Sequence, residues 1–138
     1  MNRVPRMRVV HTAMRVRDID ASLRFYEALG FERRGKLQFD GAYNVYLGVP
    51  GDGDTLELTV NEGRDEPYDL GTGYGHIALT VGDLDAVVAR LAEQGIEPEK
   101  PPYHPGGRDE VGPICFVADP DGYRIELING DEFATPQD

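Results

Sequence analysis

The sequence predicts an α+β fold made of two tandem βαβββ modules. Two observations support this prediction. Residues 11–32 align without a gap with residues 76–97, and each copy is followed by short strand-like segments separated by turn sequences. At 138 residues, the chain fits one domain or two small modules that share a core. We expect an N-terminal tail at 1–7, a first module at 8–61, a linker at 62–74, a second module at 75–130 and a C-terminal tail at 131–138.

The two aligned copies share both residues and structural signals. Each copy opens with an apolar segment rich in β-branched residues, continues with aspartates suited to capping a helix, and reaches a glycine where a helix would end. Eight of the 22 aligned pairs are identical: His11/His76, Ala13/Ala78, Val16/Val81, Asp18/Asp83, Asp20/Asp85, Ala21/Ala86, Gly30/Gly95 and Glu32/Glu97.

In the first module, the strand signal covers Val9–Val16, and Asp18 marks the start of the helix that follows. The apolar positions of that helix form only a loose stripe. After the helix, the turn sequences "DG" and "PGDGD" separate three further predicted strands, Gly35–Phe39, Tyr43–Val49 and Thr55–Val60.

The second module repeats this order. A strand is predicted at His76–Val81, and the helix after Asp83 carries the apolar stripe Leu84, Val87, Val88 and Leu91. A loop rich in proline and glycine and the turn "DPDG" then separate three predicted strands, Glu97–Lys100, Ile114–Val117 and Tyr123–Ile128.

Two histidines and two glutamates occupy equivalent places in the modules. The last strands correspond, "DTLELTV" (54–60) with "YRIELIN" (123–129), so Glu57 matches Glu126 as His11 matches His76. Strand side chains alternate between the two faces, and all four of these side chains fall on the side away from the apolar core face. If the modules pair around a pseudo-two-fold axis, the four groups converge.

Each of these residues alone has an ordinary structural explanation, because strand histidines are usually hydrogen-bonded and outward glutamates are usually solvated. Their duplication favours a different interpretation. Two carboxylates held together in a cleft repel each other unless a cation lies between them. Imidazole and carboxylate together suit a borderline divalent ion. We therefore predict that His11, Glu57, His76 and Glu126 bind a metal.

Four segments resemble glyoxalase I (lactoylglutathione lyase), a family of the vicinal oxygen chelate superfamily: "HTAMRVRDIDASLRFYEALGF", "LELTVNEG", "YDLGTGYGHIALTV" and "FVADPDGYRIELI". The resemblance extends from about Arg8 to Asn129. It implies that the two modules pair into a cupped eight-stranded mixed sheet, with the helices outside and one divalent metal inside. The family's metal ligands fall on His11, Glu57, His76 and Glu126.

The resemblance also implies how the protein assembles and which metal it prefers. Short bacterial members of the family are homodimers in which each site is shared between subunits. The chain lacks the insertions of longer zinc-using members, which favours Ni²⁺ or Co²⁺ over Zn²⁺. The sequence leaves open whether the modules pair within one chain or between two.

The reaction implied by the resemblance isomerises the hemithioacetal of methylglyoxal and a thiol, through an enediolate, to a 2-hydroxyacyl thioester. Metal charge stabilises the enediolate, and a glutamate moves the proton. The resemblance favours Glu126 as this base, with Glu57 as its counterpart. Arg15 and Asn61 match the family positions that hold the γ-glutamyl group of glutathione, and an arginine beside an amide suits carboxylate binding.

Two departures from the family leave the thiol cosubstrate open between glutathione and another thiol. The chain has "NEG" at 61–63 where the family usually has "NWG", and its loop "YHPGGRDEVGP" offers Arg108 in place of lysines. Two other functions compete with the lyase. One is a related enzyme such as an acyl-CoA epimerase, and the other is a binding protein that sequesters an antibiotic without needing metal ligands.

Composition excludes several classes of partner. A formal net charge of −11 argues against nucleic acid and against an anionic membrane surface. The single cysteine forms no internal disulfide, and neither a signal-peptide core nor a segment long enough for a membrane span is evident. These features predict a cytoplasmic protein. The resemblance to glyoxalase I implies that its partners are a small-molecule 2-oxoaldehyde–thiol adduct and a second copy of itself.

Overall fold

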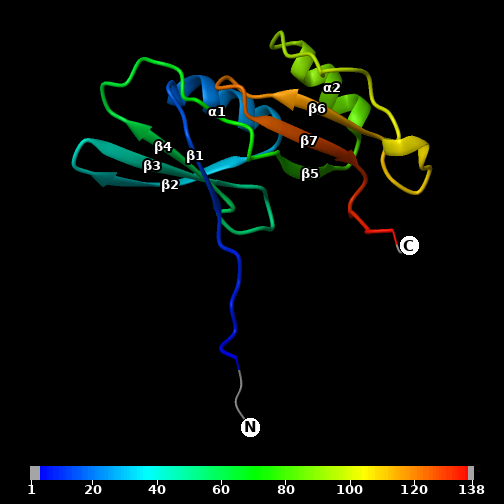
Figure 1. Cartoon of the computed structure of the whole chain (residues 1–138), viewed down its shortest axis with the longest axis horizontal. Helices are drawn as coiled ribbons and strands as arrows, with labels where there is room; N and C mark the ends of the chain where they lie inside the picture. Colours follow the sequence, from blue (N-terminus) through cyan, green and yellow to red (C-terminus); the bar gives the residue numbers. More distant parts are fainter. Residues whose placement is uncertain (1–3, 137–138) are drawn as a thin grey trace.

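Two β-sheets lie side by side in the computed structural model, which describes residues 4–136 (Figure 1). Both helices lie above the sheets in the view of Figure 1. The first sheet has the strand order β1-β4-β3-β2 and the second β5-β7-β6. The elements are β1 (Thr12–Arg15), α1 (Ile19–Ala28), β2 (Glu32–Phe39), β3 (Ala42–Gly48), β4 (Leu56–Asn61), β5 (Ile77–Val81), α2 (Leu84–Ala92), the 3₁₀ turn η1 (Pro105–Gly107), β6 (Ile114–Ala118) and β7 (Arg124–Asn129).

The two sheets repeat one topology. In each, the first strand of the module runs parallel to the last, and the last pairs antiparallel with the strand before it. The register pairs Ala13 with Glu57 in the first sheet and Ala78 with Glu126 in the second. The predicted α+β class is confirmed. A single eight-stranded cup is not formed among residues 4–136, where the strands divide into sheets of four and three.

The prediction of a strand at Glu97–Lys100 is wrong. This segment lies beside β6, but only isolated hydrogen bonds join them: Glu99 N–H donates to Phe116 O at 2.9 Å, and Tyr103 forms a single bridge with Ile114. A proline has no amide hydrogen to give to a ladder. Pro98 interrupts the segment, and Pro101 and Pro102 follow it directly, so a continuous strand does not form.

The first strand is shorter than the predicted Val9–Val16. It begins at Thr12, which pairs with Leu56, the first residue of β4. Residues 4–9 extend away from the body of the molecule (Figure 1), and Val9 is 95% exposed. A strand signal in the sequence therefore becomes a strand only as far as a neighbouring strand reaches.

The predicted helix boundaries are confirmed. The Asp18 carboxylate accepts hydrogen bonds from the backbone N–H groups of Asp20 and Ala21, and Asp83 caps α2 in the same way through Ala86 N–H. After each helix the chain turns at a glycine with positive φ, +104° at Gly30 and +76° at Gly95. No helix within residues 4–136 combines the length and the apolar character that crossing a bilayer requires.

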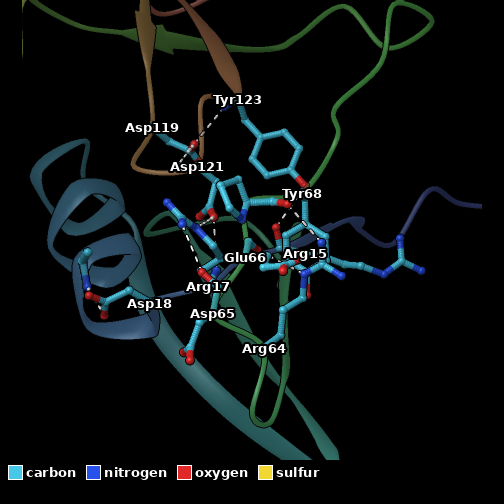
Figure 2. Close-up of polar contacts among 12 residues, drawn as sticks. Arg15, Arg17, Asp18, Arg64, Asp65, Glu66, Tyr68, Asp119, Asp121 and Tyr123 are labelled. Carbon is cyan, nitrogen blue, oxygen red and sulfur yellow. Dashed lines mark hydrogen bonds and ion pairs between the residues drawn. The ribbon is translucent and has the colours of Figure 1, made fainter.

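One apolar core joins the two modules, and a set of polar contacts ties the "DPDG" turn of the second module to the first. The buried hydroxyl of Tyr26, on α1, donates to Asp119 Oδ2 at 2.6 Å. Tyr123 Oη donates to the carbonyl of Arg15 at 2.9 Å, and the backbone N–H of Arg17 donates to Asp121 Oδ1 at 3.1 Å. Figure 2 shows Tyr123 and Asp121 directed toward Arg15 and Arg17. We call this set, Tyr26–Asp119, Tyr123–Arg15 and Arg17–Asp121, the inter-module clamp.

Replacing Tyr26 by phenylalanine should destabilise the fold by about 1–3 kcal/mol, because a buried carboxylate oxygen loses its hydrogen-bond donor. Burial already raises the pKa of Asp119, while the Tyr26 hydrogen bond acts to lower it. A raised carboxyl pKa means that the folded state binds this proton more tightly than the unfolded chain. The loss should therefore be largest near neutral pH and shrink as pH falls through the carboxyl range.

Urea unfolding at a fixed protein concentration measures this effect. Tyr43→Phe is the matched control, because the Tyr43 hydroxyl makes no hydrogen bond within residues 4–136. Equal midpoints for the two variants at neutral pH would contradict the importance of the Tyr26–Asp119 contact.

Candidate functional site

The first candidate pair is His11 and Glu57. These residues lie near the start of the neighbouring parallel strands β1 and β4. His11 precedes β1 by one residue, and Glu57 Oε1 is 3.3 Å from its Nε2. Both side chains are partly exposed, His11 at 32% and Glu57 at 14%. The parallel register brings them together, because the neighbour of Glu57 across the ladder is Ala13, two residues beyond His11 on the same face.

The second pair repeats this geometry in the other sheet. His76 precedes β5, and its Nε2 is 3.1 Å from Glu126 Oε1 on β7. An aromatic ring lies beside the imidazole in both modules: Tyr46 with its centroid 5.7 Å from that of His11, and Phe116 at 5.0 Å from His76. Each module therefore contains one histidine–glutamate pair.

The chemistry of each pair suits a divalent ion. At metal–ligand distances of about 2.1 Å, neighbouring ligands of an octahedral ion lie about 3 Å apart. The separations of 3.3 and 3.1 Å between imidazole nitrogen and carboxylate oxygen are close to this value.

The two pairs remain on separate sheets. Among residues 4–136, no group of three or more histidine, cysteine, aspartate or glutamate side chains is arranged to hold a metal ion. His11 and Glu57 belong to the first sheet, His76 and Glu126 to the second. One chain therefore presents two half-sites of two candidate ligands each.

Arg15 and Asn61 lie further along the strands that carry the first pair. Arg15 and Glu57 line one cavity of about 320 Å³, together with Ala13, Met14 and Thr59. Arg15 also borders a second cavity of about 160 Å³, whose lining includes Tyr68 and Tyr74. The Asn61 amide donates to Tyr68 Oη at 3.0 Å, so Asn61 lies at the margin of the same region.

Sequence reasoning missed Asn44. This residue of β3 donates its Nδ2–H to Glu57 Oε1 at 3.1 Å and to Tyr46 Oη at 3.2 Å, and its Oδ1 accepts from Thr59 at 2.8 Å. The only sequence signal for Asn44 was its place in the predicted strand 43–49, where alternation puts positions 44 and 46 on one face. The β3–β4 register puts Tyr46 opposite Glu57 and Asn44 opposite Thr59, and the sequence pattern left this register undetermined.

The comparisons with known proteins agree on one family. The family model described as Glyoxalase/Bleomycin resistance protein/Dioxygenase superfamily matches residues 8–127. A probable lactoylglutathione lyase of Vibrio parahaemolyticus is 40% identical over 129 residues, which cover 88% of this chain and 89% of the relative. The lactoylglutathione lyase of Escherichia coli O157:H7 is 36% identical over 129 residues, covering 88% and 92%.

Solved structures give the same answer. Glyoxalase I of Leishmania major, described as trypanothione-dependent, superposes with a TM-score of 0.77 at 35% identity, covering 91% of this chain and 88% of that one. Glyoxalase I of Zea mays superposes with a TM-score of 0.80 at 32% identity, covering 91% of this chain and 45% of that one.

Proposed function

This chain belongs to the glyoxalase/bleomycin resistance protein/dioxygenase superfamily, and from that premise we propose that it is a metal-dependent, glyoxalase I-like lyase. The predicted enzyme type, a lactoylglutathione lyase-type lyase, is confirmed by relatives of that name at 36–40% identity over most of the chain. The observation that most supports the metal-dependent reaction is the pair of equivalent histidine–glutamate half-sites, with donor atoms 3.3 and 3.1 Å apart.

We propose that a complete site forms between two copies of the chain, the module at 8–61 of one facing the module at 75–130 of the other. Four ligands, His11, Glu57, His76 and Glu126, then surround one ion. The separation of the half-sites onto two sheets supports pairing between chains. The inter-module clamp supports it too, because it holds the modules of one chain side by side. The eight-stranded cup is, on this proposal, a property of the homodimer.

The proposed reaction moves two protons within the hemithioacetal. A Glu126 carboxylate oxygen removes the proton from the carbon that carries sulfur and hydroxyl, and the electron pair forms the enediolate. The same carboxyl group returns this proton to the adjacent carbon, and the hydroxyl proton passes to the former carbonyl oxygen, which yields the 2-hydroxyacyl thioester with no atom gained or lost. A bound divalent ion, Ni²⁺ or Co²⁺ in preference to Zn²⁺, supplies the charge that stabilises the enediolate.

Arg15 and Asn61 are proposed to hold the carboxylate end of the thiol cosubstrate. Arg15 and Glu57 line one cavity, which supports this role. A substrate in that cavity could contact both the Arg15 guanidinium and the first half-site. Replacing Arg15 by alanine should raise KM for the adduct by about 10–100-fold with a smaller change in kcat, since the lost contact is present in substrate and transition state alike. Arg33→Ala, an exposed arginine on β2, is the matched control in steady-state kinetics.

One experiment tests the proposed function. Metal-free protein is reconstituted with Ni²⁺, Co²⁺ or Zn²⁺, and methylglyoxal is supplied with glutathione and then with other cellular thiols while thioester formation is followed. We expect turnover with Ni²⁺ or Co²⁺ and at least one thiol. Absence of thioester with every ion and every thiol would contradict the lyase proposal. A cytoplasmic location stays a prediction.

A further inference from the structure

The two pseudo-equivalent glutamates have different surroundings. In the first sheet, the strand beside β4 places Tyr46 opposite Glu57 and Asn44 opposite Thr59. In the second sheet, the same register places Phe116 opposite Glu126 and Ile114 opposite Ile128. Three polar groups around the first glutamate therefore correspond to three apolar side chains around the second.

The polar groups around Glu57 form a connected network, in which each hydrogen bond fixes the orientation of the next group. Thr59 Oγ1 donates to Asn44 Oδ1 at 2.8 Å, which directs the amide nitrogen of Asn44 toward Glu57 Oε1 at 3.1 Å. A carboxylate only accepts hydrogen bonds, so it requires the same amide orientation. Tyr46 Oη, 3.2 Å from the amide nitrogen, takes the second donor.

The side chains around Glu126 form no such network within residues 4–136. Within residues 4–136, Glu126 contacts His76, and its side chain accepts no hydrogen bond from any other side chain. The Phe116 ring opposite it lies edge-on to His76 and is covered by the guanidinium of Arg124, 4.0 Å from its centroid. Arg124 donates its two hydrogen bonds of 2.7 Å to Glu99, so it acts on Glu126 through its charge and does not anchor that carboxylate by a hydrogen bond.

We propose that Asn44, supported by Thr59, is a positioning residue that anchors Glu57 as a fixed metal ligand, while Glu126 keeps the freedom to leave the ion and return. This inference rests on the proposed function and assigns different roles to the two glutamates. A hydrogen-bonded carboxylate reaches the ion already oriented, and groups that orient a ligand typically change metal affinity by about 10–100-fold when removed. A carboxylate that must move as a base is better placed without such an anchor.

Asn44→Leu is the direct test, because leucine has nearly the same size, removes the donor and reproduces the apolar setting of the second module. Calorimetric titration of metal-free protein with Ni²⁺ should show binding weakened by about 10–100-fold. The ligand-field absorption of the Co²⁺-loaded protein should change as well. Gln38→Leu, which removes a side-chain amide from β2 of the same sheet, should leave both measurements unchanged.

Thr59 provides a pair of variants that nearly preserve shape. Thr59→Ser retains the hydroxyl and should bind Ni²⁺ like the parent protein, whereas Thr59→Val should bind it several-fold more weakly, as expected for the loss of one neutral hydrogen bond. This pair keeps the inference testable if Asn44→Leu lowers the urea midpoint of the apoprotein. Equal Ni²⁺ affinity in Thr59→Val, Thr59→Ser and the parent would overturn the anchoring role.

Failure of this inference is distinguishable from failure of the proposed function. If the parent protein binds no divalent ion, the metal-dependent function itself is wrong. If the parent binds Ni²⁺ and produces thioester, but Asn44→Leu folds normally and has the parent's Ni²⁺ affinity and Co²⁺ spectrum, only the role of Asn44 is wrong.

Discussion

Mixing a His11→Ala variant with a His76→Ala variant should restore about a quarter of the parent's turnover, although each variant alone is nearly inactive. Each variant keeps one intact half-site, on the second sheet in His11→Ala and on the first in His76→Ala. Random association of the two chains makes roughly half of the dimers mixed. If sites are shared between subunits, one of the two sites in every mixed dimer contains all four ligands.

The mixing experiment separates the two possible pairings of the modules. Pairing within one chain predicts no restoration, because every site then contains a missing histidine. A mixture of His11→Ala with Glu57→Gln is the matched control: both changes damage the first half-site, so no mixed dimer has a complete site under either arrangement. The chains are co-refolded or co-expressed to allow exchange, and thioester formation is compared at equal total protein. Restoration in the control as well would contradict the shared site.

Replacing Glu126 by glutamine should reduce kcat by about 10²–10⁴-fold while most Ni²⁺ binding persists. Glutamine has nearly the same shape and still presents an oxygen to an ion, but its amide does not take a proton from carbon. The apolar surroundings of Glu126 support its role as the mobile base, since within residues 4–136 no side-chain donor apart from His76 holds it in place.

Glu57→Gln is the matched comparison for Glu126→Gln, because the two residues are equivalent in the two modules. Glu57 accepts a hydrogen bond from Asn44, so the change should weaken Ni²⁺ binding more than Glu126→Gln does. Calorimetry supplies the metal affinities, and kcat is measured at saturating Ni²⁺. If Glu126→Gln retains the parent's kcat, the assignment of the base is wrong.

The sequence predicted both helices and most of the strands because their signals are local. Strand alternation, aspartate helix caps and glycines after the helices each depend on a few neighbouring residues, and the duplicated order of these signals revealed the repeat. The strand at Glu97–Lys100 was predicted by correspondence with the first module, and it does not form because Pro98 within the segment and Pro101 and Pro102 after it have no amide hydrogen for a ladder. The strand at Val9–Val16 was too long because the sequence does not show where a neighbouring strand ends.

By itself, the sequence determined which residues are the candidate ligands and on which strand face each lies, because side-chain direction in a strand follows from residue parity. Only the tertiary structure decided which candidates meet. Strand register set the histidine–glutamate contacts of 3.3 and 3.1 Å and put Asn44 beside Glu57. Packing of α1 against the "DPDG" turn held the two half-sites apart, and such contacts join residues as distant in sequence as Tyr26 and Asp119, which no local pattern encodes.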